Sequence, residues 1–170
     1  MAAPSDPPDV TFGEDQQPRD PGPDAFVGAF ALLTDGTGRY LTMDAGEHGV
    51  IDLIRAPRLE DETYRESLLR EIGWRLSIDP KRDIVCSGVP RAHLNSRLCG
   101  GGSGEPKWYI CQFYVAHFFG RRWAEAVDGR SDVVWLTGAD IMNGGNGTQT
   151  LRKDVRDLIG IADLIPPDER

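Results

Sequence analysis

Carboxylate and guanidinium groups alternate along the stretch ETYRESLLREIGWRLS, residues 62–77. Glu71 and Arg75 are four residues apart, so they can meet on one face of a helix. Glu62 and Arg70 precede them in the same stretch. Carboxylate oxygens are the ligands that hard cations such as Mg²⁺ prefer, so a catalytic helix is one interpretation. The alternative is a solvated ladder of ion pairs, which is common on exposed helices.

The apolar residues of the same stretch predict that it is helical. Tyr64, Leu68, Ile72 and Leu76 recur every four residues, which places them on one stripe that a sheet could bury. The charged residues fall on other faces of the helix, where they could reach a ligand. Pro80 is expected to end the helix, because proline cannot continue its hydrogen bonding.

Strands before and after this helix predict the layer against which it packs. Apolar, aromatic and β-branched runs indicate strands, and the last periodic segment indicates a second helix. Residues 90–107 and 143–147 are expected to be glycine-rich loops. The order of elements predicts an α+β fold, a mixed α/β/α sandwich in which helices cover a mixed sheet. The expected strands are Phe26–Leu33, Arg39–Met43, Gly49–Ile54, Ile84–Val89, Trp108–Gly120 and Asp132–Thr137, and the expected helix is Thr150–Leu164.

The first 24 residues differ in composition from the rest of the chain. They hold six acidic residues against one basic residue, half of the 12 prolines and few large apolar residues. Such a segment cannot bury enough surface to offset its ordering entropy. We therefore expect a disordered acidic tail at 1–24 and a single domain at 25–170. When the charge of this tail is subtracted from the net charge of −8, the rest of the chain is only mildly acidic. An acidic domain argues against strong non-specific DNA binding.

Other features bear on compartment. No apolar run is long enough to span a membrane, and the N-terminus lacks the basic and then apolar pattern of a secretory signal. The three cysteines include no closely spaced pair, which favours reduced thiols over a zinc site. These features predict an intracellular, cytoplasmic protein without membrane association, and they leave a viral particle open.

The register of this stretch resembles the box of the Nudix hydrolases. That box is a glycine, five residues, a glutamate, seven residues and R-E-U-x-E-E-x-G-U, where U is aliphatic. A gapless alignment over 56–78 matches the box at Glu62, Arg70, Glu71, Ile72 and Ile78. The opening run FVGAFALLTD and the later run DVVWLTGADI also resemble strands of that family, so the resemblance covers about 26–165. It implies a Nudix-like fold.

Four positions depart from the box. Ala56 and Ser77 stand where the box has glycines, and Trp74 and Arg75 stand where it has two metal-binding glutamates. Trp74 offers no oxygen ligand, and Arg75 brings a positive charge to a cation site. The resemblance therefore implies a degenerate site for which no metal cofactor is expected. Arg75 could take the place of the metal charge and bind a phosphate.

An active enzyme is the alternative that the resemblance also allows. Glu71, Glu62 and Arg70 would then be its catalytic residues, and Glu71 with Glu66 would hold Mg²⁺ or Mn²⁺. A loop acid such as Glu125 could complete the ligand set, as could Asp128.

Basic residues in and around the first glycine-rich loop form a candidate rim for a nucleotide or an RNA 5′ end. They are Arg91, Arg97 and Lys107. The leading hypothesis is a catalytically degenerate Nudix-like domain that binds a nucleotide or an RNA end, or that assembles with a protein through its acidic tail or domain surface. The alternatives are an active pyrophosphohydrolase of nucleoside diphosphate derivatives, including RNA caps, and an unrelated α+β interaction domain.

Overall fold

The computed structural model describes residues 9–11, 24–99 and 106–170, and these form one mixed sheet between helices. The central strands are β2 (Phe26–Thr34) and β8 (Lys107–Phe118), which run parallel from the Phe26–Tyr109 pair to the Thr34–His117 pair. Beyond β8 the sheet continues with β7 (Ala92–Leu98) and then β1 (Asp9–Thr11). Beyond β2 it continues with β3 (Arg39–Asp44), β4 (Val50–Asp52) and β10 (Thr150–Leu151).

Three short strands branch from this path. They are β5 (Arg55–Pro57), which pairs with β2, β6 (Ile84–Cys86), which pairs with β8, and β9 (Val133–Thr137), which pairs with β3. All three pairings are antiparallel, whereas β2 and β8 are parallel, so the sheet is mixed, as the sequence predicts.

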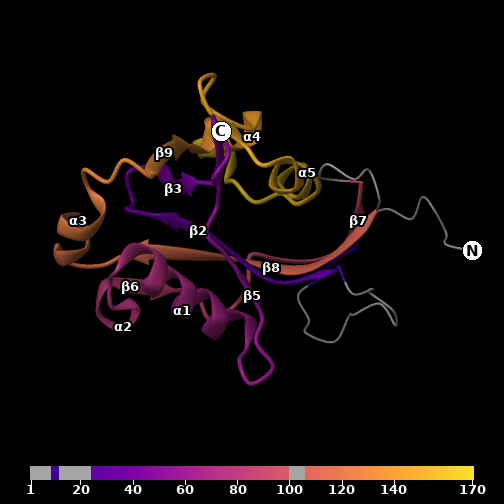
Figure 1. Ribbon diagram of the computed structural model, residues 1–170, viewed down its shortest axis with the longest axis horizontal. Coiled ribbons are helices and arrows are strands. Elements are labelled where there is room, and N and C mark those ends of the chain that lie inside the picture. Colours follow the sequence, from indigo (N-terminus) through magenta and orange to yellow (C-terminus); the bar gives the residue numbers. More distant parts are fainter. Residues whose placement is uncertain (1–8, 12–23, 100–105) are drawn as a thin grey trace, which may run out of the picture.

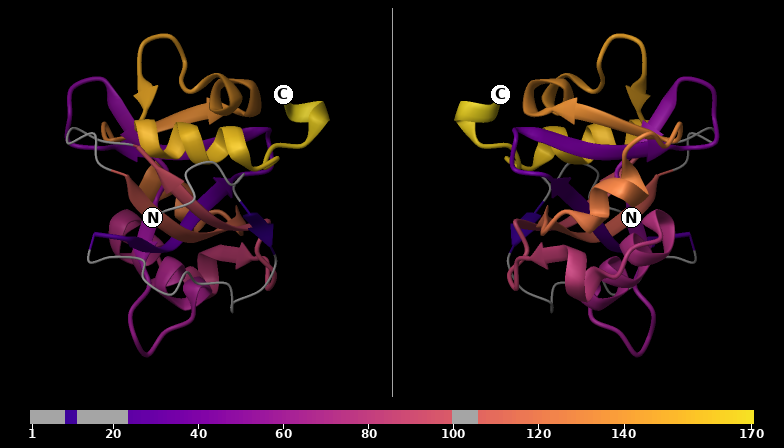
Figure 2. Two further views of the ribbon diagram at one scale, coloured as in Figure 1. Left: turned by 90° about the vertical axis from the view of Figure 1, so that its right-hand side faces the viewer. Right: turned by 90° about the vertical axis from the view of Figure 1, so that its left-hand side faces the viewer.

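Helices cover both faces of the sheet (Figures 1 and 2). One face carries α1 (Tyr64–Leu76), and the other carries α4 (Gly138–Asn143) and α5 (Lys153–Ile161). Alternate residues of β2 divide between the two cores, because side chains alternate along a strand. Ala31 and Leu33 pack on the α1 side, and Phe30 and Leu32 pack on the α5 side. The predicted α/β/α sandwich is confirmed.

The sequence places α1 accurately, and its ends have clear causes. Thr63 caps the N-terminus in a capping box with Glu66, and the predicted apolar stripe is buried. The helix ends at Leu76 because Ser77 turns into the left-handed conformation, with φ of 56°. Pro80 is therefore not the residue that ends α1. It begins the short helix α2 (Pro80–Asp83), which packs close to Gly73.

The sequence interpretation of residues 90–107 as a loop is wrong. Within it, Ala92–Leu98 forms β7 along the edge of β8. Ala92, Leu94 and Leu98 alternate with more polar residues, which is a strand period hidden by low overall hydrophobicity. Residues 100–105 of that interval lie outside the described part of the chain.

Other predicted boundaries also shift. The strand predicted at Gly49–Ile54 is divided into β4 and β5, and the predicted strand Ile84–Val89 ends at Cys86. The terminal helix is shorter than predicted because Thr150–Leu151 pairs with β4 before α5 begins. Three short helices, α2, α3 (Arg122–Val127) and α4, were not predicted.

The segment 1–24, which we predicted to be disordered, contributes one described strand. Asp9–Thr11 pairs antiparallel with residues 93–95 of β7, and Asp24 begins the next described region. The other residues of the segment lie outside the described part of the chain. No helix in the described ranges is long and apolar enough to cross a membrane.

Candidate functional site

The carboxylate of Glu62 is held against the start of α1 by two side chains. The buried Ser67 hydroxyl donates to it at 2.7 Å, and Arg70 Nε donates to each of its oxygens at 3.1 Å. The Ser67 oxygen also accepts the Leu59 N–H at 3.2 Å. The hydrogen bond from Arg70, followed by that from Ser67, lowers the pKa of Glu62. The two matched positions of the box, Glu62 and Arg70, are therefore brought together in the fold.

The carboxylate of Glu66 serves the N-terminus of the helix. It accepts the Thr63 N–H at 3.3 Å, while the Thr63 hydroxyl accepts the Glu66 N–H at 3.1 Å. Five residues along a helix rotate by about 140°, so Glu66 and Glu71 point to different sides of α1. The structure gives Glu66 a capping contact, and it does not bring this side chain to Glu71.

Arg75 and Trp74 differ sharply in their surroundings. Trp74 is 75% exposed, whereas Glu71 and Arg75 are half-buried. Asp132, just before β9, lies within the electrostatic reach of Arg75. The hydrogen bond from Arg130 is the largest cause of the lowered pKa of Asp132, and the charge of Arg75 adds to it. The charge of Arg75 therefore acts on a carboxylate from a distant part of the chain.

The acids proposed as additional metal ligands do not gather with Glu71. Glu125 is exposed in α3, and Asp128 is exposed just after that helix. In the described ranges, no group of three or more His, Cys, Asp or Glu side chains is arranged to hold a metal ion. The site therefore consists of Arg75 and several carboxylates that do not gather into one metal-binding group in the described ranges.

The three residues of the candidate basic rim do not share one surface. Arg91 reaches the Leu164 carbonyl at 2.7 Å, beyond the end of α5. Lys107 lies 5.5 Å from the Tyr109 ring, on the α5 side of the sheet, whereas Arg97 alternates with buried Leu98 and faces the α1 side. Arg91 bonds to the backbone of Phe113, six residues from Lys107, which corresponds to about 20 Å of strand.

An aromatic cluster on the α1 side was not identified from the sequence as a unit. Phe118 and Trp123 stack with ring centroids 4.2 Å apart, and both lie edge-on to Trp135. The guanidinium of Arg39 lies 4.0 Å above the Trp135 ring. These rings pack against the α1-side core, so the ring of Trp123 makes most of its packing contacts within the protein. Only the aromatic content of the strands signalled this cluster.

Comparison with known proteins supports the fold. Neither a protein-family model nor a curated protein matches the sequence. The structure resembles that of NrtR from Shewanella oneidensis with a TM-score of 0.50 and 21% identity, covering 81% of this chain and 61% of that one. This chain therefore spans about three fifths of the length of NrtR.

Two further solved structures resemble the chain more weakly. NrtR complexed with a 27mer DNA gives a TM-score of 0.45, 20% identity and coverage of 80% of this chain and 59% of that one. The E. coli ORF135 protein gives a TM-score of 0.42 and 13% identity, with coverage of 78% of this chain and 87% of that one. The fold assignment rests on the first comparison and on the layers described above. The chain is an α+β protein with a Nudix-like fold.

Proposed function

We propose that this Nudix-like domain is catalytically degenerate. It binds a nucleotide or an RNA 5′ end at α1 through the phosphate groups of that ligand. The observation that carries the proposal is the position of Arg75. It lies half-buried in the last turn of α1, at the position where the resembling box has a glutamate. A guanidinium supplies a permanent positive charge and can bind a phosphate with two parallel hydrogen bonds.

Trp74 adds a second element to this surface. Its indole is 75% exposed, and stacking of a base on an aromatic ring contributes about 1–3 kcal/mol. Neighbouring helical residues diverge by about 100°, so Trp74 and Arg75 would contact different parts of one ligand. A base on Trp74 and a phosphate at Arg75 match a nucleotide. An exposed tryptophan would equally suit a protein interface, which the experiment below distinguishes.

The carboxylates support binding over hydrolysis. A metal-dependent hydrolase needs several oxygen ligands around one cation. Glu62 is bonded by Ser67 and Arg70, and Glu66 caps α1, which leaves Glu71 beside Arg75 in the matched register. The active pyrophosphohydrolase would need Mg²⁺ or Mn²⁺ and a rearrangement that frees these groups.

Titration with ADP in the presence of EDTA tests the proposal. We expect calorimetric binding without metal, a loss of at least tenfold in affinity for Arg75→Gln and a smaller loss for Trp74→Ala. Arg156→Gln is the matched control, because Arg156 is exposed on α5, on the other face of the sheet. Equal affinity of Arg75→Gln and Arg156→Gln would contradict the proposal. Absence of ADP binding, with capture of a protein that requires Trp74, would replace it with an assembly function.

A further inference from the structure

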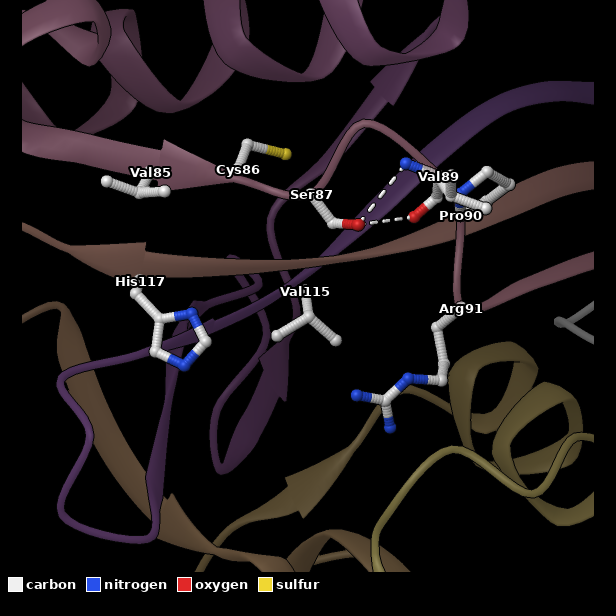
Figure 3. Close-up of a pocket in the computed structure, with 8 residues that line it drawn as sticks. All are labelled: Val85, Cys86, Ser87, Val89, Pro90, Arg91, Val115 and His117. Atoms are coloured by element: carbon white, nitrogen blue, oxygen red, sulfur yellow. Dashed lines mark hydrogen bonds between the residues drawn. The ribbon is translucent and has the colours of Figure 1, made fainter.

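A groove of about 580 Å³ lies on the sheet face opposite α1 (Figure 3). Its walls come from β6, the segment that follows it and the end of β8. Val115 packs against the core on the α5 side, and Arg91 bonds to the Leu164 carbonyl beyond α5. These two residues lie on the face away from α1, whereas Cys86, which also lines the groove, packs against the α1-side core.

The floor of the groove is apolar because of the strand register. Val85 of β6 pairs directly with His117 of β8, so their side chains share a face, and Val115 lies on that face two residues earlier. Val85 is 57% exposed, and Val89 on the adjoining segment is 65% exposed. Open valines at the base of a groove favour a ligand that brings its own apolar surface.

The polar side chains that line the groove are Arg91, His117 and Ser87. Arg91 and His117 line it together with valines and small residues, and no carboxylate is among its lining residues. In Figure 3 both basic side chains lie on the same side of β8, with Val115 between them. Glu169, which is not a lining residue, accepts the Tyr40 hydroxyl at 2.9 Å, and the charges of Glu169 and Arg91 both act on Tyr40.

We infer that the groove is a second ligand site, which binds a small molecule with an apolar chain and an anionic head group. The chain lies over Val85 and Val115, and the head group meets the guanidinium of Arg91, which the Leu164 carbonyl holds in place. A volume of about 580 Å³ falls within the range of about 300–1,000 Å³ typical of small-molecule pockets. This site is independent of the function proposed for α1.

Titration of the full chain with octanoate, octyl phosphate and octylammonium tests the inference by amide chemical shifts. We expect shifts at Val85, Val115 and His117 with the two anions, and at least tenfold weaker binding of octylammonium. The anion that binds with the higher affinity identifies the preferred head group as carboxylate or phosphate. Shifts elsewhere, or equal binding of all three probes, would overturn the inference.

Substitutions in the groove distinguish the loss of a positive charge from a loss of folded structure. Arg91→Gln should weaken octanoate binding at least tenfold, and Arg91→Lys should retain part of it if the positive charge matters. Arg121→Gln is the matched control, since Arg121 is exposed and outside the groove. His117→Gln, at an exposed position, provides a second test should Arg91→Gln unfold. Unchanged binding in both Arg91→Gln and His117→Gln would contradict the inference. Concentration-dependent dimers abolished by Val89→Glu would instead assign the groove to a second copy of the chain.

Discussion

Arg55 donates a hydrogen bond to each carboxylate oxygen of Asp154, both at 2.9 Å, although the two residues are 99 positions apart. The same guanidinium donates to Asp52 at 2.7 Å and 3.1 Å, and the Tyr109 hydroxyl donates to Asp154 at 2.8 Å. The contacts tie β4, β5 and β8 to the start of α5. Since β5 leads directly into the loop before α1, they also fix where that loop begins.

Removal of the Asp154 charge should destabilise the fold strongly. Asp154→Asn leaves Arg55 with one carboxylate partner in a largely buried setting, for which a cost of about 3 kcal/mol is expected. In a chain of this size that corresponds to a fall of about 6–12 °C in Tm. Asp157→Asn on the same helix is the matched control. It breaks the exposed 2.8 Å pair with Lys153 and should cost less than about 1 kcal/mol. Equal losses in the two variants would refute the importance of the buried network.

The same carboxylate should make stability depend on pH in the acid range. Burial alone would raise the pKa of Asp154, but the hydrogen bond and charge of Arg55 outweigh it and lower the pKa to about 2. A lowered folded-state pKa stabilises the fold above the unfolded value near 3.8, and the contribution is lost as pH falls toward 2. It amounts to about 2 kcal/mol. Denaturant unfolding at pH 5, 4, 3 and 2 should therefore show a shallower decline for Asp154→Asn than for the native chain, and parallel curves would contradict this assignment.

Ser77 should be replaceable by glycine with a gain in stability. Its φ of 56° is the only positive value at a non-glycine residue in the described part of the chain, and a left-handed conformation costs an L-residue about 1 kcal/mol or more. Ser77→Gly should raise the free energy of unfolding by up to about 1 kcal/mol. Ser131→Gly, at another exposed serine, should be neutral or destabilising. A loss of stability in Ser77→Gly would show that the serine side chain contributes more than the strain removes.

The elements best predicted from sequence are those with a strong local period. The apolar residues of α1 recur every four positions, and the parallel central strands are nearly continuous apolar runs, so both could be located. β7 was missed because His93 and Ser96 are buried polar residues that dilute its alternation. α3 and α4 have six residues each, which is too short for a periodic pattern to stand out.

The candidate site was predicted only in part, for two physical reasons. The Thr63 and Glu66 spacing is a capping-box signature, so the helix-capping contact of Glu66 could have been recognised in the sequence. The effect of the Arg75 charge on the pKa of Asp132 could not, because Asp132 comes from a distant part of the chain, just before β9. Arg97 and Lys107 looked like neighbours only while 90–107 was treated as a loop, since pairing of β7 with β8 directs their side chains to opposite faces.

Glutamates introduced at positions 74 and 75 should create a metal-binding site. The double variant Trp74→Glu/Arg75→Glu places carboxylates one turn from Glu71 and removes the positive charge that opposes a cation. We expect it to bind Mn²⁺ at least tenfold more tightly than the native chain, as measured by water proton relaxation. Trp74→Gln/Arg75→Gln, which removes the arginine without adding charge, is the matched control. No gain over that control would mean that α1 is not placed to hold a metal.

The most direct test of the central claim is an assay of turnover. The purified chain would be incubated with nucleoside diphosphate derivatives and capped RNA in Mg²⁺ or Mn²⁺, in parallel with Glu71→Gln. If α1 binds phosphate without metal-dependent hydrolysis, the native chain will show no turnover above that variant, at a sensitivity well below ordinary enzyme rates. Metal-dependent turnover that Glu71→Gln abolishes would contradict the account and establish an active hydrolase.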